Sequence, residues 1–510
     1  MQIKQVRISN LMSFPYQKDL AKAPDVNFYT GEKSIVNILI GPNGAGKSNF
    51  LQIINQILTV GLMKDYTYDK TIIKEKQENK YKEAISCNDI PIKNLKKHFL
   101  YPTKSSHVQL LISIGENDMK NSIVLAEHQT TINKIIEKYS SIAVRLPDIQ
   151  IEKIKKIKDI CLIYEIDTEK KTLTINEEKL SNEEKYILLY LKNQELMQIA
   201  IDIYNHFEIE DESQRLAYLK NTFAFVGLHR NFSDIELSVN PSIWNEYISS
   251  KNSHHYYSFI GYYLCIHKLR HIVKKLSKNI NTVTEEEIKQ ILEQSTFYKN
   301  LQQVIALYMN KTIDIQYTAP NLTIVLKDKN NQTYSFKELS LGEQSFLIII
   351  LTIYGYDLKN GLLFIDEPEI HFHPQMQKKF MNFLEHVNKK IKIQCILSTY
   401  SPIFINEENI YNVYRFSKKD LVTTIRNPSH SIHEEESDLI HILKYGNTAK
   451  IFFVDKIIMV EGETDGYFFE YYLNHLKNTS PERSDIANYE IVNINGKGAF
   501  HQWRSFLARF

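Results

Sequence analysis

The segment GPNGAGKSN at residues 41–49 restricts the folds open to this chain more than any other stretch. An apolar run at 35–40 precedes it and a helix-patterned segment at 50–58 follows it. Strand, glycine-rich turn and helix therefore occur in the order that a phosphate-binding loop requires. Glycines let successive backbone N–H groups point at phosphate oxygens, and the positive end of the following helix faces the same anion. The segment predicts an α/β fold that binds a nucleotide.

Individual residues of this loop have different expected roles. Lys47 is expected to reach the β and γ phosphates of ATP, and Ser48 to place its hydroxyl on Mg²⁺. The alternative is a glycine-rich turn with an accidental lysine, which does not account for the flanking strand and helix. The residues predicted to bind the nucleotide here are Gly41, Asn43, Gly44, Gly46, Lys47, Ser48 and Asn49.

The composition fits a soluble globular protein with two or three domains: the chain has 510 residues, 24% charged and 43% apolar. A net charge of +2 gives no overall field for nucleic acid and leaves only local patches. The N-terminus lacks a signal-peptide pattern, and no run approaches the roughly 18 apolar residues of a membrane span. Four widely spaced cysteines indicate reduced, buried thiols, so we expect a cytoplasmic protein without membrane contact. They are Cys87, Cys161, Cys265 and Cys395.

Hydrophobic patterning divides the chain into residues 1–128, a first ATPase lobe; 129–310, a mostly helical insertion; 311–445, a second lobe; and 446–510, a C-terminal module. In the first lobe, segments 108–114 and 122–126 are expected to form a β-hairpin. Within the insertion, one hairpin is expected at 160–175. Lysine-rich runs at 152–158 and 273–278 could contact phosphate backbones, although such runs are usually solvated helix faces.

A second anion site is expected where Ser340-Leu-Gly-Glu-Gln precedes an apolar helix at 345–354. A helix start with a hydroxyl donor and a close-approach glycine can contact a phosphate. Taken alone, Ser340 would be interpreted as an ordinary N-cap. The upstream phosphate loop and the carboxylates downstream favour the anion site.

Those carboxylates end an apolar strand at 361–365. Asp366 would hold Mg²⁺ through water, while Glu367 would take a proton from the attacking water. The nearby pair His371 and His373 could indicate a metal site, but here His373 and the proline after it are expected to open the next helix.

These motifs, GPNGAGKSN, SLGEQ, EPEIHFHP and STYSP in that order, resemble those of ABC-type ATPases of the RecF and chromosome-maintenance kind. The resemblance implies an α/β ABC-type P-loop ATPase head with a helical insertion. It also implies a head-to-head dimer or a higher even assembly, in which Ser340, Gly342 and Glu343 contact ATP held by another copy. The strand that ends at His229 and Arg230 would lead to a nucleotide-sensing loop; a surface arginine is the alternative.

The chain departs from this pattern at Tyr400, where such ATPases have a histidine that contacts the γ-phosphate. Tyrosine can donate one hydrogen bond, but it cannot carry positive charge or shuttle protons near neutral pH. We therefore include Tyr400 with Lys47 and Glu367 in the catalytic group and expect slow hydrolysis, with ATP acting more as a clamp than as a fuel.

The C-terminal module resembles the opening βαβ part of a TOPRIM domain: an apolar strand ends in Glu461-Gly462 and is followed by a helix, a second strand and a glycine turn. In that fold the residue matching Glu461 is a general acid/base or a metal-site residue. An ATPase followed by TOPRIM resembles the OLD family of ATP-dependent nucleases, which includes anti-phage Gabija and PARIS proteins. The D-x-D strand of a working TOPRIM is not reached before Phe510. We expect either a truncated chain or a half-domain completed by another polypeptide.

The sequence leaves three functions open. The first is an ATP-hydrolysing, OLD-like ATPase in anti-phage defence. The second is an ATP-dependent scaffold that holds a nuclease or effector partner and has no nuclease of its own. The third is a RecF-like repair ATPase that binds double-stranded DNA, against which the Glu461-Gly462 module argues.

Overall fold

The computed structural model describes residues 1–28, 36–58, 65–74, 78–88, 104–167, 172–209, 211–217, 219, 222–228, 230, 257–276, 284–318, 321–406, 409–427, 448–454, 456–479 and 489–508. The prediction for His229 falls outside these residues, as do Ser277 and Lys278 of the lysine-rich run at 273–278; for Lys274 and Lys275 only the helical backbone is described.

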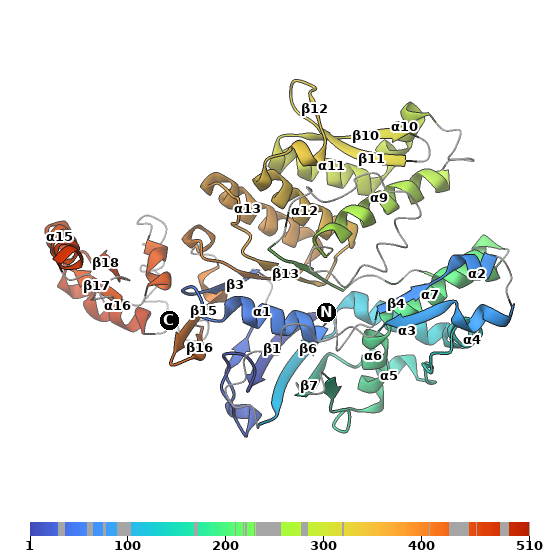
Figure 1. Ribbon diagram of the computed structural model, residues 1–510, viewed down its shortest axis with the longest axis horizontal. Coiled ribbons are helices and arrows are strands. Elements are labelled where there is room, and N and C mark those ends of the chain that lie inside the picture. The colour runs from blue at the N-terminus through green and yellow to red at the C-terminus, as the bar shows by residue number, and fades with distance from the viewer. Residues whose placement is uncertain are drawn as a thin grey trace.

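A six-stranded sheet lies at the centre of the molecule and is parallel except at one edge (Figure 1). Its strands, in spatial order, are β16 (Val422–Arg426), β15 (Val413–Lys419), β3 (Val36–Ile40), β14 (Gln394–Ser398), β13 (Leu362–Asp366) and β9 (Phe223–Val226). Every residue of β3, β13 and β14 is buried, as expected for parallel strands covered on both faces. Three neighbouring strands thus lead to the expected site: β3 to the phosphate loop, β14 to Tyr400 and β13 to the paired carboxylates.

Each face of this sheet has its own core, as successive residues of β3 demonstrate. Ile38 and Ile40 belong to one hydrophobic cluster and Leu39 to the other. Helix α1 (Lys47–Gln56) packs on the Leu39 face, between the central sheet and a second sheet (Figure 1). The Ile38 face is covered by α9 (Tyr257–Leu276), α10 (Glu285–Gln294), α11 (Thr296–Met309), α12 (Leu341–Gly355) and α13 (Pro374–Ile391), with the small sheet β10 (Thr312–Thr318), β11 (Asn321–Lys327) and β12 (Thr333–Tyr334).

The second sheet is antiparallel, and its strand order is β2 (Asp25–Asn27), β1 (Gln2–Ser9), β6 (Ser106–Ser113), β7 (Asp159–Asp167) and β8 (Thr172–Ile175). β7 pairs with β6 from Ser113–Asp159 to Ser106–Ile166. The hairpin assigned to the insertion is thus part of the first lobe's sheet, and the predicted boundary at 128 does not end that lobe. An alternating pattern of apolar and polar residues identifies a strand, but it does not show which strand from a distant part of the chain will pair with it.

The β-hairpin predicted for 108–126 is wrong in its second strand, because residues 116–127 form α3 (Glu116–Glu127). The Asp118 carboxylate accepts a hydrogen bond from the Gly115 N–H (3.0 Å), which caps the helix. Acidic residues in the first turn also favour the helix dipole. A short apolar run fits a strand or a helix equally, so capping decided the outcome. Around α3 lie β4 (Asp65–Tyr68), α2 (Lys70–Lys74), β5 (Ile85–Asn88), α4 (Gln129–Tyr139), α5 (Ile151–Ile154), α6 (Asn182–Lys192) and α7 (Gln194–Ile203).

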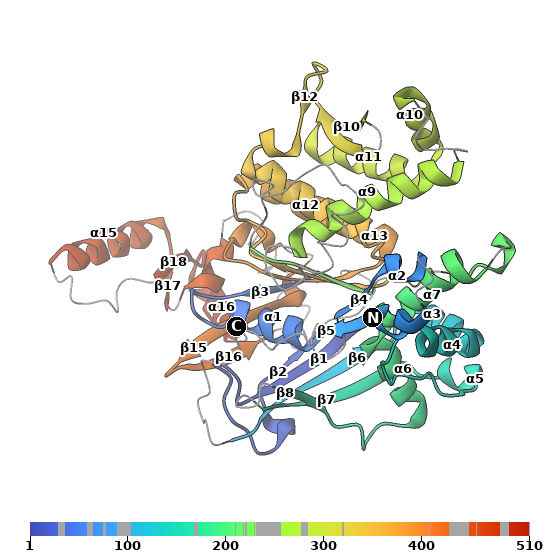
Figure 2. The same ribbon diagram turned by 45° about the vertical axis from the view of Figure 1, so that its right-hand side comes forward.

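The C-terminal module contains β17 (Lys456–Val460), α15 (Glu463–Thr479), β18 (Tyr489–Asn493) and α16 (Phe500–Leu507), with the two strands parallel. Its α16 joins the head core through buried Trp503 and Phe506. Arg415 of β15 donates to the carbonyl oxygens of Phe452 (3.1 Å) and Val454 (2.8 Å) at the same junction. Helix α15 projects away from the head (Figure 2).

The thiol prediction holds for Cys265 and Cys395, which are buried, and is wrong for Cys87 and Cys161, which are exposed. Within the described part of the chain, every helix is too short or too polar to span a membrane.

Candidate nucleotide-binding site

The site lies at the carboxyl ends of β3, β13 and β14, where parallel strands of an open α/β sheet commonly place ligands. β3 runs into the phosphate loop, β13 ends at Asp366, and β14 ends at Ser398, two residues before Tyr400. The structure thus brings the phosphate loop together with two segments that follow it by more than three hundred residues in sequence.

The phosphate loop has the backbone conformation that its glycines predict. Gly41, Gly44 and Gly46 have φ values of 137°, 76° and 105°, which L side chains rarely adopt. At Gly41 a Cβ atom would also collide with the Phe416 carbonyl. Gly46 precedes α1 and no side chain caps it, so the first N–H groups of α1 remain available for an anion. Asn43 is exposed at the loop and Asn49 is half-buried in α1.

Lys47 is buried, with 2% of its surface exposed, and its ammonium group bends back over the loop. Its Nζ donates to the carbonyl oxygens of Gly41 (2.7 Å) and Pro42 (3.2 Å). Nζ also lies 3.6 Å from the ring centroid of Tyr400, a cation–π contact. Burial lowers the pKa of Lys47 to about 8, against the opposing effect of three nearby carboxylates.

The hydroxyl of Ser48 donates to Asp366 Oδ1 (3.3 Å). Ser398 donates to the same oxygen, and burial raises the pKa of Asp366 above its ordinary value. A hydroxyl and a carboxylate that converge on one point are hard oxygen ligands of the kind Mg²⁺ prefers. These residues therefore fit a nucleotide-bound Mg²⁺.

Glu367 follows Asp366 with a φ of 46°, an uncommon conformation for a residue other than glycine and one that clusters at functional sites. Its N–H donates to the carbonyl oxygen of Ser398 (3.0 Å). Burial, then the charges of Asp366 and Glu369, raises the pKa of Glu367. A half-buried carboxylate with a raised pKa suits a general base.

Tyr400 and Glu369 form the wall of the site next to Lys47. The Tyr400 N–H donates to Glu369 Oε1 (2.6 Å), while Oε2 of that carboxylate is buried without a hydrogen-bond partner among the described residues. Burial raises the pKa of Glu369 and also that of the Tyr400 phenol. Tyr400 therefore stays neutral and contacts Lys47 through its ring face.

Arg230 is a site residue whose role the sequence left undetermined, and the surface-arginine alternative is wrong because the side chain is 3% exposed. Its guanidinium donates to the carbonyl oxygens of Asp366 (2.7 Å) and Glu367 (2.5 Å). It also donates to the Gly227 carbonyl (2.8 Å) and to Ser345 Oγ (2.8 Å). Position at a strand end was the only sequence signal for this arginine.

The signature residues lie at the N-terminus of α12, which covers the face of the sheet opposite α1 (Figure 1). Ser340 is exposed and forms a capping box with Glu343. The Glu343 carboxylate also pairs with Lys311 (2.7 Å), so its oxygens are engaged within the chain. A Cβ at Gly342 would lie 2.6 Å from the His371 carbonyl oxygen, which explains why glycine is needed here.

Glu461 is half-exposed at the end of β17, and its carboxylate lies 3.6 Å from Lys497 Nζ. Its backbone carbonyl accepts a hydrogen bond from the Gly496 N–H (3.1 Å), which joins the two strand ends of the module. Across the described ranges, no group of three or more His, Cys, Asp or Glu side chains could hold a metal ion. For His373, the structure shows helix capping: its ring accepts from the Gln375 N–H (3.4 Å) at the start of α13.

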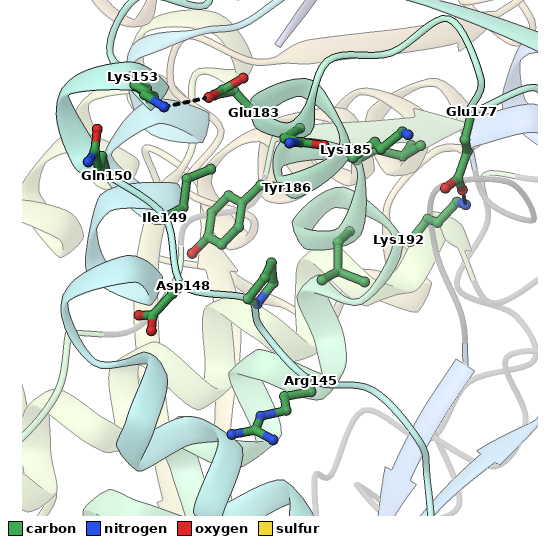
Figure 3. A pocket seen from close by; sticks show the side chains of 14 residues that line it. Arg145, Asp148, Ile149, Gln150, Lys153, Glu177, Glu183, Lys185, Tyr186 and Lys192 are labelled. Carbon is green, nitrogen blue, oxygen red and sulfur yellow. Dashed lines mark hydrogen bonds and ion pairs between the residues drawn. The ribbon is translucent and has the colours of Figure 1, made fainter.

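A pocket of about 870 Å³ lies between α5 and α6, and Figure 3 shows the side chains around it. Its charges are largely paired: Lys153 with Glu183 (3.6 Å) and Lys192 with Glu177 (2.6 Å). The lysine-rich run at 152–158 contributes Lys153 to this pocket, where Glu183 offsets its charge.

Comparisons with known proteins agree with the geometry of the head. A family model described as an AAA ATPase domain matches residues 1–405. The chain belongs to this family. A second model, described as the TOPRIM domain of overcoming lysogenization defect protein-like (OLD-like) proteins, matches residues 452–510. The ATPase head and the OLD-like TOPRIM region predicted from the motifs are therefore confirmed.

Similar proteins have names that belong to nucleases and defence systems. Endonuclease GajA of Bacillus cereus (strain HuB5-5) is 22% identical over 98% of this chain and 73% of its own length. The retron Vc95 probable ATPase of Vibrio cholerae is 23% identical over 86% of this chain and 79% of its own. The OLD nuclease of Thermus scotoductus is 30% identical over 31% of each chain.

Proposed function

We propose that this chain binds and hydrolyses ATP with Mg²⁺ between two copies of its ATPase head, and that the nucleotide state controls a TOPRIM nuclease in anti-phage defence. The observation that carries the proposal is the meeting of Lys47, Ser48, Asp366 and Glu367 at one edge of the central sheet. The names of the relatives, an endonuclease, a retron ATPase and an OLD nuclease, support the defence context.

The chain's own groups divide the chemistry among them. The loop N–H groups and Lys47 bind the phosphates, while Ser48 and Asp366 would hold Mg²⁺, which neutralises charge on the transferred phosphoryl group. Glu367 orients the attacking water and takes its proton, and a carboxylate with a raised pKa accepts that proton more readily. Tyr400 must leave the face of Lys47 or share it with the nucleotide.

A second copy would complete the site. Ser340 is exposed at the N-terminus of α12, on the other side of the sheet from α1, and buried Gly342 follows two residues later. The exposed helix start supports the proposal that this segment contacts a nucleotide held by a neighbouring copy. A head-to-head pair with two shared nucleotides satisfies both half-sites by symmetry, and a higher even assembly does the same.

A second function is favoured by one contact, the ring of Tyr400 over Lys47. A residue that holds the phosphate-binding lysine and cannot shuttle protons suits a slow clamp that retains a nuclease or effector partner. The two functions predict different activities. The clamp predicts ATP-dependent retention of a partner protein, whereas the ATP-controlled nuclease predicts metal-dependent cleavage of double-stranded DNA.

The variant Glu367→Gln tests the ATPase proposal. Loss of the base should leave ATP bound and uncleaved and should increase the population of dimers, which size-exclusion chromatography with light scattering measures. The matched control is Glu286→Gln, a change at an exposed glutamate in the first turn of α10. Turnover of Glu367→Gln equal to that of the control would remove Glu367 from its role.

The nuclease output is tested separately by nicking of supercoiled plasmid in the presence of Mg²⁺ or Mn²⁺ with ATP. Nicking that Glu461→Ala abolishes supports the TOPRIM assignment. If the protein shows ATP turnover without nicking, and ATP-dependent capture of a partner, the clamp is the better description.

A further inference from the structure

We propose that Arg230 is a positioning residue that ties the catalytic loop of one head to the signature helix of the same head, so that engagement of a neighbour's nucleotide by α12 sets the geometry of Glu367. The inference deepens the proposed function and rests on it. It adds a residue and a direction of coupling within that site.

The first step is the strain at the end of β13. Glu367 and His371 have positive φ values of 46° and 69°, and such conformations persist only where surrounding contacts hold them. The Glu367 N–H is held by the Ser398 carbonyl (3.0 Å), and the Glu367 carbonyl accepts from Arg230 (2.5 Å). Arg230 also holds the carbonyl of Asp366. The guanidinium therefore fixes both peptide units that aim the catalytic carboxylates.

The second step is the connection to α12. Arg230 Nε donates to Ser345 Oγ (2.8 Å), and Ser345 is fully buried five residues after Ser340. One planar guanidinium presents five donors in a fixed fork, so it can hold four acceptors on two elements, whereas the ammonium of lysine has only three donors. A shift of α12 along its axis would pull on the same side chain that holds Glu367.

A second contact joins the same two elements. The His371 carbonyl lies so close to Gly342 that a Cβ there would be 2.6 Å from its oxygen. The ring of Phe372 also packs against Phe346 of α12, with centroids 5.9 Å apart. The loop that starts at the catalytic base thus ends against the signature glycine. A movement of Glu367 or of α12 near Gly342 would therefore displace the other through these contacts.

The buried charge supports this reading of Arg230. The described hydrogen bonds of its guanidinium go to backbone carbonyls and a hydroxyl, while Asp366, Glu367 and Glu369 interact with it only through their charges. A residue placed only to neutralise carboxylates would bond them directly. The Arg230 guanidinium instead donates hydrogen bonds to backbone carbonyl groups and so holds the main chain of the catalytic loop.

The test compares Ser345→Ala with Thr352→Ala. The first removes the Arg230 acceptor on α12 and leaves the carbonyl bonds. The second removes an equally buried hydroxyl of the same helix that bonds only within the helix, to the Ile348 carbonyl (2.8 Å). Arg230→Lys is the conservative variant that keeps the charge but loses the fork.

Amide hydrogen exchange of the nucleotide-free protein gives the first readout. Ser345→Ala and Arg230→Lys should raise exchange about tenfold in both 366–372 and 341–346, as expected for loss of a hydrogen bond to a charged group, with other segments unchanged. Thr352→Ala should not produce this paired change. If Ser345→Ala behaves like Thr352→Ala, or exchange rises uniformly, the inference is overturned.

Steady-state kinetics gives the second readout. Ser345→Ala should lower kcat about tenfold with KM nearly unchanged, and should reduce the dependence of rate on enzyme concentration that a two-copy site produces. A wild-type protein that neither binds nor hydrolyses ATP would refute the proposed function alone, because the exchange comparison needs no nucleotide. Active wild type with unchanged kcat in Ser345→Ala would refute the Arg230 link alone.

Discussion

The pH dependence of ATP binding follows from the burial of Lys47. Its pKa is about 8 in the free protein because desolvation outweighs the attraction of the carboxylates around it. ATP binding requires the ammonium form, and bound phosphate raises the pKa of this lysine again. The dissociation constant should therefore rise as the pH passes through about 8. At one unit above its pKa only about a tenth of the lysine is protonated, so affinity should fall about tenfold between roughly pH 7 and 9.

Isothermal titration calorimetry with ATP and constant excess Mg²⁺, repeated in buffers of different ionisation enthalpy, measures both the affinity and the linked proton uptake. The matched control is Lys47→Arg, whose guanidinium stays protonated throughout this range. The affinity of this variant for ATP should be lower than that of wild type but should not decline with pH. A wild-type dissociation constant that is the same near pH 7 and near pH 9 would refute the reasoning.

The same shift has a consequence for stability with a definite sign. The pKa of Lys47 lies below its unfolded value of about 10.5, so between about pH 8 and 10.5 the unfolded chain binds more protons. The contribution of Lys47 to the free energy of unfolding therefore rises with pH between about pH 8 and 10.5. Its charged form costs the free head up to roughly 3 kcal/mol below pH 8. Lys47→Met should accordingly be more stable than wild type near neutral pH in urea denaturation.

Three further changes test other parts of the site. Gly342→Ala should destabilise the head by about 1–3 kcal/mol in urea denaturation, because its Cβ meets the His371 carbonyl, and should weaken ATP-dependent dimerisation; wild-type behaviour in both assays would contradict the close approach. Tyr400→His should raise kcat about tenfold or more, since imidazole can carry a proton near neutral pH, and a lower kcat would show that the ring contact with Lys47 is needed for turnover. Ser48→Ala should raise the Mg²⁺ concentration needed for half-maximal turnover while ATP binding without metal stays near wild type; an unchanged Mg²⁺ requirement would exclude its hydroxyl as a ligand.

The conformation of the phosphate loop, the strand that ends at the paired carboxylates and the helix start at Ser340 were predictable because each is a local pattern. The glycines at 41, 44 and 46 predict backbone with positive φ angles in the loop. The apolar run before Asp366 predicts a buried strand that ends in a polar residue. The spacing of Ser340 and Glu343, three residues apart, predicts the capping box that starts α12. Such features depend on neighbours within a few residues, so one chain is enough to identify them.

Other features depended on partners far away in the chain. The strands at 159–175 joined the first lobe because β6, some fifty residues earlier, had an edge to fill. The wrong strand prediction at 122–126 is different, since the cap of α3 between Gly115 and Asp118 is local and was overlooked in the sequence. Half of the cysteine prediction failed since exposure depends on what packs over a strand.

The sequence alone determined that Lys47, Ser48, Asp366 and Glu367 meet, because they lie in motifs whose order and flanking strands dictate where the strands end. The chemistry proposed for the head rests on that meeting. Only the tertiary structure decided what holds those groups in place. Arg230 gained its role when β9 came to lie beside β13, and Tyr400 when the end of β14 turned its ring onto Lys47. The physical reason is that a buried cation acquires its hydrogen-bond partners from whichever elements pack around it, and local sequence carries no record of that packing.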